Sequence, residues 1–136
     1  MQNPPPVQTT KSSTGLDDNI AALLSYIFGW VSGLIFYLIE KESRLVRFHA
    51  MQSILLNAGA IVLVIVLWVA WIVLTIIGAM INESIGTLFG FLGGLLFFVV
   101  WIGLLIGVVL CLIKAYQRQY FKLPIIGNLA EKFSAK

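Results

Sequence analysis

Hydrophobic and polar positions separate along this chain into three apolar stretches joined by short polar segments. The stretches cover Ile20–Ile39, Ile54–Ile81 and Ile85–Ile113, and none of them contains an Asp, Glu, Lys or Arg. About 20 helical residues cross the hydrocarbon core of a bilayer, which is roughly 30 Å thick. The pattern therefore predicts an all-α membrane protein with three transmembrane helices.

The second stretch carries the clearest signal. Between Ile61 and Ile77, 13 of the 17 residues are Ile, Leu or Val. Neither this stretch nor the third has the polar face that a helix on the surface of a soluble protein requires. Both are longer than a bilayer needs, so we expect them to tilt or to project beyond the lipid. The short connection between them predicts an antiparallel hairpin.

The two ends of the chain have a different composition. Residues 1–15 are rich in Pro, Gln, Ser and Thr, which predicts a disordered tail before a single membrane domain over residues 16–136. Within residues 124–135, apolar side chains recur at three- and four-residue spacing. This periodicity predicts a short C-terminal amphipathic helix that lies on the membrane surface or against the first loop.

Composition supports the membrane assignment and excludes several other classes. The chain is 60% hydrophobic and 11% charged, whereas soluble domains are about 25% charged. Nine Lys and Arg without a basic helix do not predict nucleic-acid binding. The one cysteine excludes an intramolecular disulfide, and no nucleophile with a neighbouring base is visible. We expect neither an enzyme, nor a cofactor, nor a metal site.

Positive charges predict the orientation. Lys11 is the one Lys or Arg before the first stretch, three lie in the loop after it, none between the second and third, and five follow the third. With three spans, eight of the nine fall on one side, which is cytoplasmic by the positive-inside rule. The prediction is a multi-pass protein of the cell membrane with an outer N-terminus and a cytoplasmic C-terminus.

Small residues recur at intervals that allow close helix packing in lipid. They are Ser25, Gly29 and Gly33 in the first stretch and Gly90, Gly94, Gly103 and Gly107 in the third. Packing within one chain is one interpretation, and a homo-oligomer that uses the second glycine face is another.

Polar residues follow one face of the second stretch and of the segment before it. Such a stripe should face protein, because an unpaired polar group in lipid is costly. It can form a seam of the helix bundle or line a path for a substrate or ion. On the stripe lie His49, Ser53, Asn57, Trp68, Trp71 and Thr75. His49 and Ser53 also belong, with Arg47 and Gln52, to a motif whose role is open.

Several of these segments resemble a widespread family of small prokaryotic membrane proteins of unknown function. The resemblance rests on Ser25-Tyr26, Gly29-Trp30, the block Val46–Ser53 and Leu123–Gly127. The family is in turn distantly similar to the twenty-kilodalton subunit of the chloroplast inner-envelope import translocon. The resemblance implies a helix-bundle fold, and a non-enzymatic interaction, translocation or assembly component with the bilayer and other membrane proteins as partners. A small oligomeric channel or transporter, with its path along the polar stripe, is the alternative.

Overall fold

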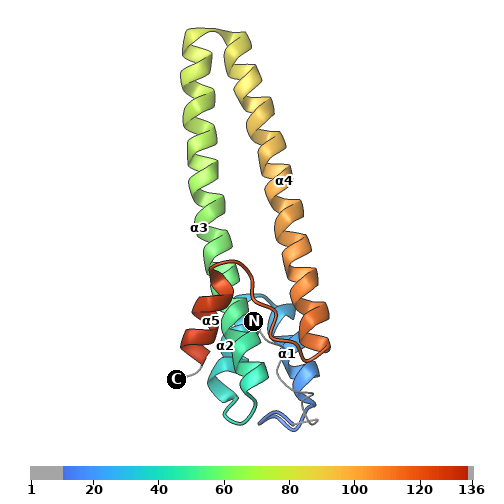
Figure 1. Cartoon of the computed structure of the whole chain (residues 1–136). Coiled ribbons are helices and arrows are strands. Elements are labelled where there is room, and N and C mark those ends of the chain that lie inside the picture. The colour runs from blue at the N-terminus through green and yellow to red at the C-terminus, as the bar shows by residue number, and fades with distance from the viewer. Residues whose placement is uncertain (1–10, 135–136) are drawn as a thin grey trace. The chain divides into compact units, whose positions relative to one another are not determined.

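Helices account for most of the chain between Lys11 and Ser134, the part that this computed structural model describes; residues 1–10 and 135–136 lie outside it. No β-strand occurs within residues 11–134. The all-α prediction is therefore confirmed for this part. Five helices follow one another along the chain (Figure 1): α1 Asp18–Ile27, α2 Trp30–Ile39, α3 Arg44–Ile81, α4 Glu83–Tyr116 and α5 Ile126–Ser134.

The chain divides into two compact units. The terminal unit comprises Met1–Ala58 and Gly107–Lys136, and the hairpin unit comprises Gly59–Ile106. Both long helices contribute to both units, because α3 has 38 residues and α4 has 34. The two units are described separately below.

The hairpin unit consists of two antiparallel helical segments joined by one residue, Asn82 (Figure 1). The Asn82 side-chain oxygen accepts a hydrogen bond from the Ser84 N–H at 2.8 Å, and the Asn82 carbonyl accepts one from the Ile85 N–H at 3.0 Å. These bonds satisfy backbone donors in the first turn of α4. Asn82 therefore ends one helix and caps the next.

The apolar surfaces of α3 and α4 are almost entirely uncovered. In the most apolar window of each helix, 0% and 6% of the residues are buried within the protein. A soluble protein would bury such surfaces in its core, so lipid is the environment that suits them. The second and third predicted stretches are thus confirmed as helices long and apolar enough to cross a membrane.

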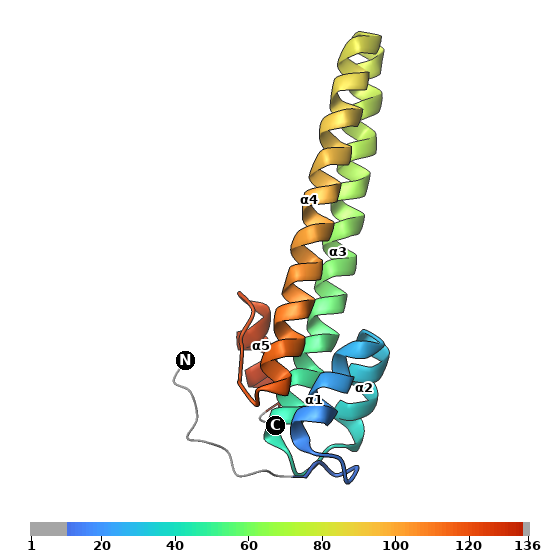
Figure 2. The same ribbon diagram turned by 90° about the vertical axis from the view of Figure 1, so that its right-hand side faces the viewer.

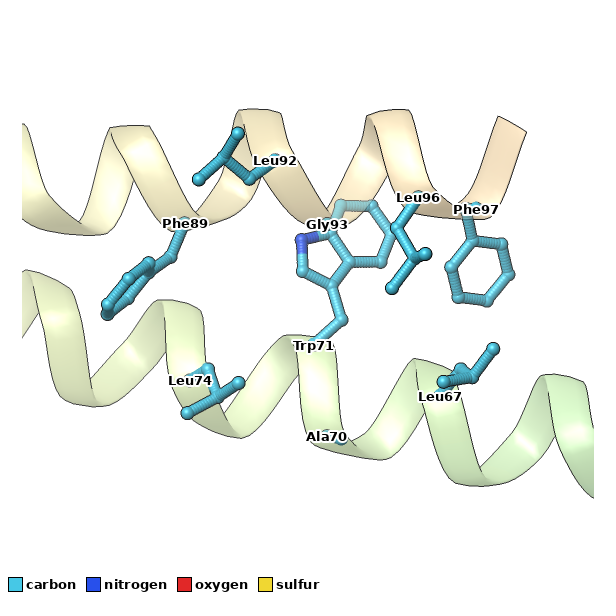
Figure 3. Close-up of a pocket in the computed structure, with 9 residues that line it drawn as sticks. All are labelled: Leu67, Ala70, Trp71, Leu74, Phe89, Leu92, Gly93, Leu96 and Phe97. Carbon is cyan, nitrogen blue, oxygen red and sulfur yellow. The ribbon is translucent and has the colours of Figure 1, made fainter. Parts of the chain in front are cut away.

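The ring of Trp71 on α3 packs tightly against Gly93 of α4 in the hairpin unit. The indole N–H donates to the Gly90 carbonyl at 3.1 Å, and the ring lies directly over Gly93 (Figure 3). A Cβ at Gly93 would come within 2.0 Å of the Trp71 ring. Beside the ring, apolar side chains line a cleft of about 350 Å³. Gly93 is therefore the glycine that lets the Trp71 ring pack between the helices.

The third predicted span is not confirmed, because residues 20–39 do not form one continuous helix. The chain breaks at Phe28-Gly29, leaving α1 and α2 with 10 residues each. Each is about 15 Å long, which is half of a hydrocarbon core. Gly29 has φ +62°, a backbone conformation that residues other than glycine rarely adopt. The two short helices lie side by side as a hairpin (Figure 2).

This hairpin also removes the basis for an outer N-terminus. The Ser13 N–H donates to the Glu40 carboxylate at 3.0 Å, so the start of α1 and the end of α2 lie together. A membrane-spanning helix would hold these two residues about 30 Å apart. Residues 11–15, which the composition assigns to a disordered tail, form a hydrogen-bonded turn, with the Gly15 N–H donating to the Ser12 carbonyl at 2.9 Å. The rest of that predicted tail, residues 1–10, lies outside the described residues.

The short C-terminal helix α5 packs within the terminal unit. The Tyr37 hydroxyl donates to the Phe133 carbonyl at 3.1 Å, and Arg47 Nε donates to the Ser134 carbonyl at 3.4 Å. Both bonds hold the last turn of α5. Leu129 and Phe133 on the helix, and Ile125 just before it, stay exposed. The helix is thus fixed at its C-terminal end and uncovered along an apolar stripe.

Replacement of Gly93 by Ala should destabilise the hairpin unit, whereas the same change at Gly94 should not. At Gly93 the new Cβ would overlap the Trp71 ring and force it to move, at a cost of about 1–3 kcal/mol. At Gly94 the Cβ would lie 3.8 Å from that ring, an ordinary contact. Thermal unfolding in detergent micelles, followed by circular dichroism, measures the difference. Equal melting temperatures for the two variants would contradict this packing.

Candidate functional site

A buried cluster of polar side chains lies in the terminal unit, centred on the hydroxyl of Tyr26. This oxygen lies 2.8 Å from His49 Nδ1 and 3.1 Å from Gln52 Nε2. His49 and Gln52 are completely buried, and Tyr26 is 5% exposed. These hydrogen bonds join α1 to the first turns of α3, beside an apolar core that includes Ala22 and Val46.

The partners of the His49 ring fix the direction of these hydrogen bonds. His49 Nε2 lies 2.8 Å from the Gln119 carbonyl, so this nitrogen carries the proton and donates it. In the neutral ring Nδ1 then accepts from the Tyr26 hydroxyl, which in turn accepts from Gln52. A directed chain results, from Gln52 through Tyr26 to His49 and on to Gln119. In such a chain each donor faces an acceptor, and the bonds polarise one another.

The segment between α4 and α5 is held by the same side chains. Its backbone leaves the helix at Arg118, where φ is +57°. Gln52 Nε2 donates to the Phe121 carbonyl at 2.9 Å, and Gln52 Oε1 accepts from the Leu123 N–H at 3.3 Å. Together with the His49 bond to Gln119, three alternate residues of the segment are bonded to α3. These bonds replace those that a regular element would supply.

The start of α1 is joined to the end of α4. Arg118 Nε donates to the buried Asp18 carboxylate at 2.7 Å, and Asn19 Nδ2 donates to the Tyr116 carbonyl at 3.1 Å. The Asn19 bond satisfies a carbonyl at the C-terminus of α4, where helices lack internal donors. The start of α1 and the end of α4 therefore meet at one place in the terminal unit.

Glu40 forms a second buried polar group, at the other end of the α1–α2 hairpin. Its carboxylate accepts from the N–H groups of Ser13, Glu42 and Ser43 at 2.8–3.0 Å and from the Ser13 hydroxyl at 2.8 Å. Burial by itself would raise the pKa of Glu40. The hydrogen bonds outweigh it, so the pKa lies below its ordinary value.

Arg47 links three elements beside this carboxylate. Its Nη1 donates to the Glu40 carbonyl at 2.8 Å, and its guanidinium lies 4.6 Å from the centre of the Tyr37 ring. Its Nε bond to Ser134 reaches α5. Arg47 therefore holds α2, α3 and α5 together.

Ser53 and Asn57 hold the break between α1 and α2. The Ser53 hydroxyl donates to the Gly29 carbonyl at 3.1 Å. Asn57 Nδ2 donates to the Ser53 carbonyl at 2.8 Å, and a Cβ at Gly29 would lie 3.1 Å from Asn57 Oδ1. Gly33 lies one turn along α2, where a Cβ would come within 2.9 Å of the Ala50 carbonyl. Small residues here let α2 approach α3 closely.

The remaining candidate residues do not join this cluster. Trp68 is 52% exposed, and Thr75 donates to the Trp71 carbonyl of its own helix at 2.8 Å. The Ser25 hydroxyl likewise donates within its own helix, to the Ala22 carbonyl at 2.6 Å. Gly90 lies beside Thr75 and Gly94 beside Trp71, at ordinary contact distances. A Cβ at Gly103 or Gly107 would meet no described atom within 4 Å.

Sequence reasoning missed the centre of the cluster. Tyr26 lies in a segment that carries the family resemblance, but its hydroxyl was not among the candidate groups. A polar side chain seven residues before Gly33 in an apolar stretch was the available signal. Gln119 and Phe121 contribute backbone carbonyls, for which the sequence holds no signal at all. Asp18 and Arg118 are 100 positions apart, so their pairing depends on the fold.

A known protein family matches most of this chain. The family is the magnetosome magnetite crystal formation protein family, and the match covers residues 16–130. The chain belongs to this family. The matched range includes every residue of the polar cluster. A family of prokaryotic membrane proteins was expected from the resemblance and is confirmed, whereas the relation to the chloroplast translocon stays a prediction.

Archaeal relatives extend the comparison over nearly the whole chain. A UPF0132 membrane protein of Methanocaldococcus jannaschii is 42% identical over 124 residues, which cover 91% of this chain and 94% of the relative. Another, from Archaeoglobus fulgidus, is 38% identical over 117 residues, covering 86% of this chain and 95% of the relative. No solved structure matches. Membership together with the uncovered apolar helices identifies this family member as a membrane protein.

Loss of the Tyr26 hydroxyl should destabilise the terminal unit more than loss of the Tyr37 hydroxyl. Tyr26→Phe leaves His49 Nδ1 and Gln52 Nε2 buried without this partner, at a cost of about 1–3 kcal/mol. Tyr37→Phe removes one exposed bond to Phe133, and we expect a loss below about 1 kcal/mol. Hydrogen–deuterium exchange of the peptide around Gln119 measures the effect. Similar acceleration in both variants would argue against a central role for Tyr26.

Glu40 should make the terminal unit less stable in acid. Because its folded-state pKa is lowered, its contribution is complete above the ordinary pKa of 4.5 and is lost as the pH falls through the folded-state value. Glu40→Gln should therefore weaken protection of residues 12–26 near pH 7, and the difference from wild type should shrink as the pH falls below 4.5. Hydrogen–deuterium exchange of both proteins is compared at each pH, because the intrinsic exchange rate of an unprotected amide also changes with pH. Glu42→Gln, at an exposed position, is the control and should follow the wild type.

Proposed function

We propose that this protein is a non-enzymatic component of a membrane assembly that contacts other proteins through its terminal unit. The observation that supports this is the inward direction of the unit's polar chemistry. His49, Gln52 and Glu40 are completely buried and hydrogen-bonded to the protein's own groups. Such buried groups stabilise the fold of the terminal unit. Contacts with other proteins must therefore be made by its exposed surface.

The α5 stripe is the best candidate for this surface. Ile125, Leu129 and Phe133 are 77%, 40% and 41% exposed. They recur at four-residue spacing, while the last turn of the helix is held by Tyr37 and Arg47. A preformed helix with an apolar stripe loses little conformational entropy on binding, which favours a protein groove as its partner.

The cytoplasmic side of the cell membrane is the proposed location of the terminal unit. α1 begins beside the end of α4, so both termini lie on one side in this proposal. That side then carries all nine Lys and Arg, one more than the three-span arrangement allowed.

A channel or transporter along the polar stripe receives no comparable support. The Trp71 N–H is bonded to Gly90 and the Thr75 hydroxyl to its own helix, so these groups are already satisfied. The family is described by magnetite crystal formation in magnetosomes, whereas the archaeal relatives are named only as membrane proteins. These names support the membrane setting of the proposed function.

Photo-crosslinking in the native membrane tests the proposal. A photoreactive amino acid at Leu129 should give discrete adducts with other proteins. The same group at Val66, which is 58% exposed on the hairpin unit, is the control and should give lipid adducts. If Leu129 yields only lipid adducts or adducts with further copies of the chain, an assembly role through α5 is wrong.

A further inference from the structure

The α1–α2 hairpin has the dimensions and polarity of a segment that enters a membrane without crossing it. We propose that this hairpin is re-entrant: it inserts into the leaflet on the side of the termini, with Phe28 at its tip among the acyl chains. In this proposal lipid acyl chains contact the exposed apolar face of the hairpin. Three independent features support the proposal.

Polarity changes along the hairpin from its open end to its tip. The open end carries Asp17, Asp18 and Glu40–Glu42. At the tip, Ile27 is 49% exposed, Phe28 77% and Trp30 51%. Exposed apolar side chains continue along α2 to Leu38 and Ile39, so the charged residues alone distinguish the open end. A hairpin that enters a bilayer and keeps only its open end in water has this pattern.

Backbone groups at the break have partners that a turn in water would not need. The Phe28 N–H donates to the Ser32 hydroxyl at 3.1 Å, and that hydroxyl donates to the Ser25 carbonyl at 3.0 Å. The Ser53 hydroxyl donates to the Gly29 carbonyl. Water would satisfy such groups at an exposed turn. In lipid nothing else can, so irregular backbone persists there only when the protein supplies the bonds.

Contacts with α3 place the tip beside the apolar part of that helix. Near the open end, the Glu40 carbonyl is bonded to Arg47. At the tip, Gly29 lies beside Asn57. The apolar run of α3 starts at Ile54, between these two contacts. About three residues, or roughly 5 Å, therefore separate the start of this run from the tip contact. The hairpin should enter the outer acyl region and stop well short of the far leaflet.

Depth-dependent fluorescence quenching tests the insertion. Phe28→Cys in a Cys111→Ser background carries an environment-sensitive fluorophore, and the protein is reconstituted into phosphatidylcholine–phosphatidylglycerol vesicles. We expect stronger quenching by a nitroxide high on the acyl chain than by a water-soluble quencher. Lys41→Cys, at the open end, is the matched control and should show the reverse order. Val31→Cys, which is 44% exposed in the native chain, repeats the measurement if the Phe28 variant does not fold.

Labelling with a membrane-impermeant maleimide tests the topology. Single cysteines at Lys11, Lys41 and Lys132 should react from one side of sealed vesicles, and one at Ser84 from the other. Reaction of the Lys11 position from the Ser84 side would mean that the segment crosses the bilayer, and would overturn the proposal. Quenching of the Phe28 label mainly by the water-soluble quencher would also overturn it. Self-quenching that increases with protein density would do the same, because it would place a second copy of the chain, and not lipid, against the tip.

Discussion

Irregular backbone near a bilayer must find its hydrogen-bond partners within the protein, because lipid offers none. In the terminal unit, the first turns of α3 supply them. His49 and Gln52 bond the segment after α4, and Ser53 bonds the break between α1 and α2. Since these side chains stand on one rigid helix, two irregular segments from opposite ends of the chain share one support. The arrangement of the terminal unit depends on this support.

The block Val46–Ser53 is therefore explained as architecture. It contains a histidine, a glutamine, a serine and an arginine, a set of residue types that is common in catalytic and binding sites. Each one is bonded to a backbone carbonyl of this same chain. A buried group that is fully bonded is costly to disturb, so substitutions here should act through folding. Membership in the family extends this interpretation to relatives only where they retain the same partners.

Two kinds of packing coexist along α3. In the hairpin unit the helix meets α4 through shape, with Trp71 over Gly93 and one hydrogen bond to Gly90. In the terminal unit it meets its neighbours through directed polar bonds and through an apolar core that includes Leu45 and Val46. Apolar helices in lipid associate through close van der Waals packing, because the hydrophobic effect does not drive them together there. Polar bonds can fix segments that have no helical backbone pairing of their own.

The sequence by itself determined the two long helices and the amphipathic one. Length and absence of charge are enough for α3 and α4, and four-residue spacing is enough for α5. Only the tertiary structure decided that Ile20–Ile39 is broken. A glycine in an apolar stretch fits a continuous membrane helix equally well, and the positive φ at Gly29 is held by Ser32, Ser53 and Asn57 from elsewhere. The Tyr26 cluster was hidden for the same reason. Its partners are carbonyls, which every residue has, and only the fold selects which of them a side chain meets.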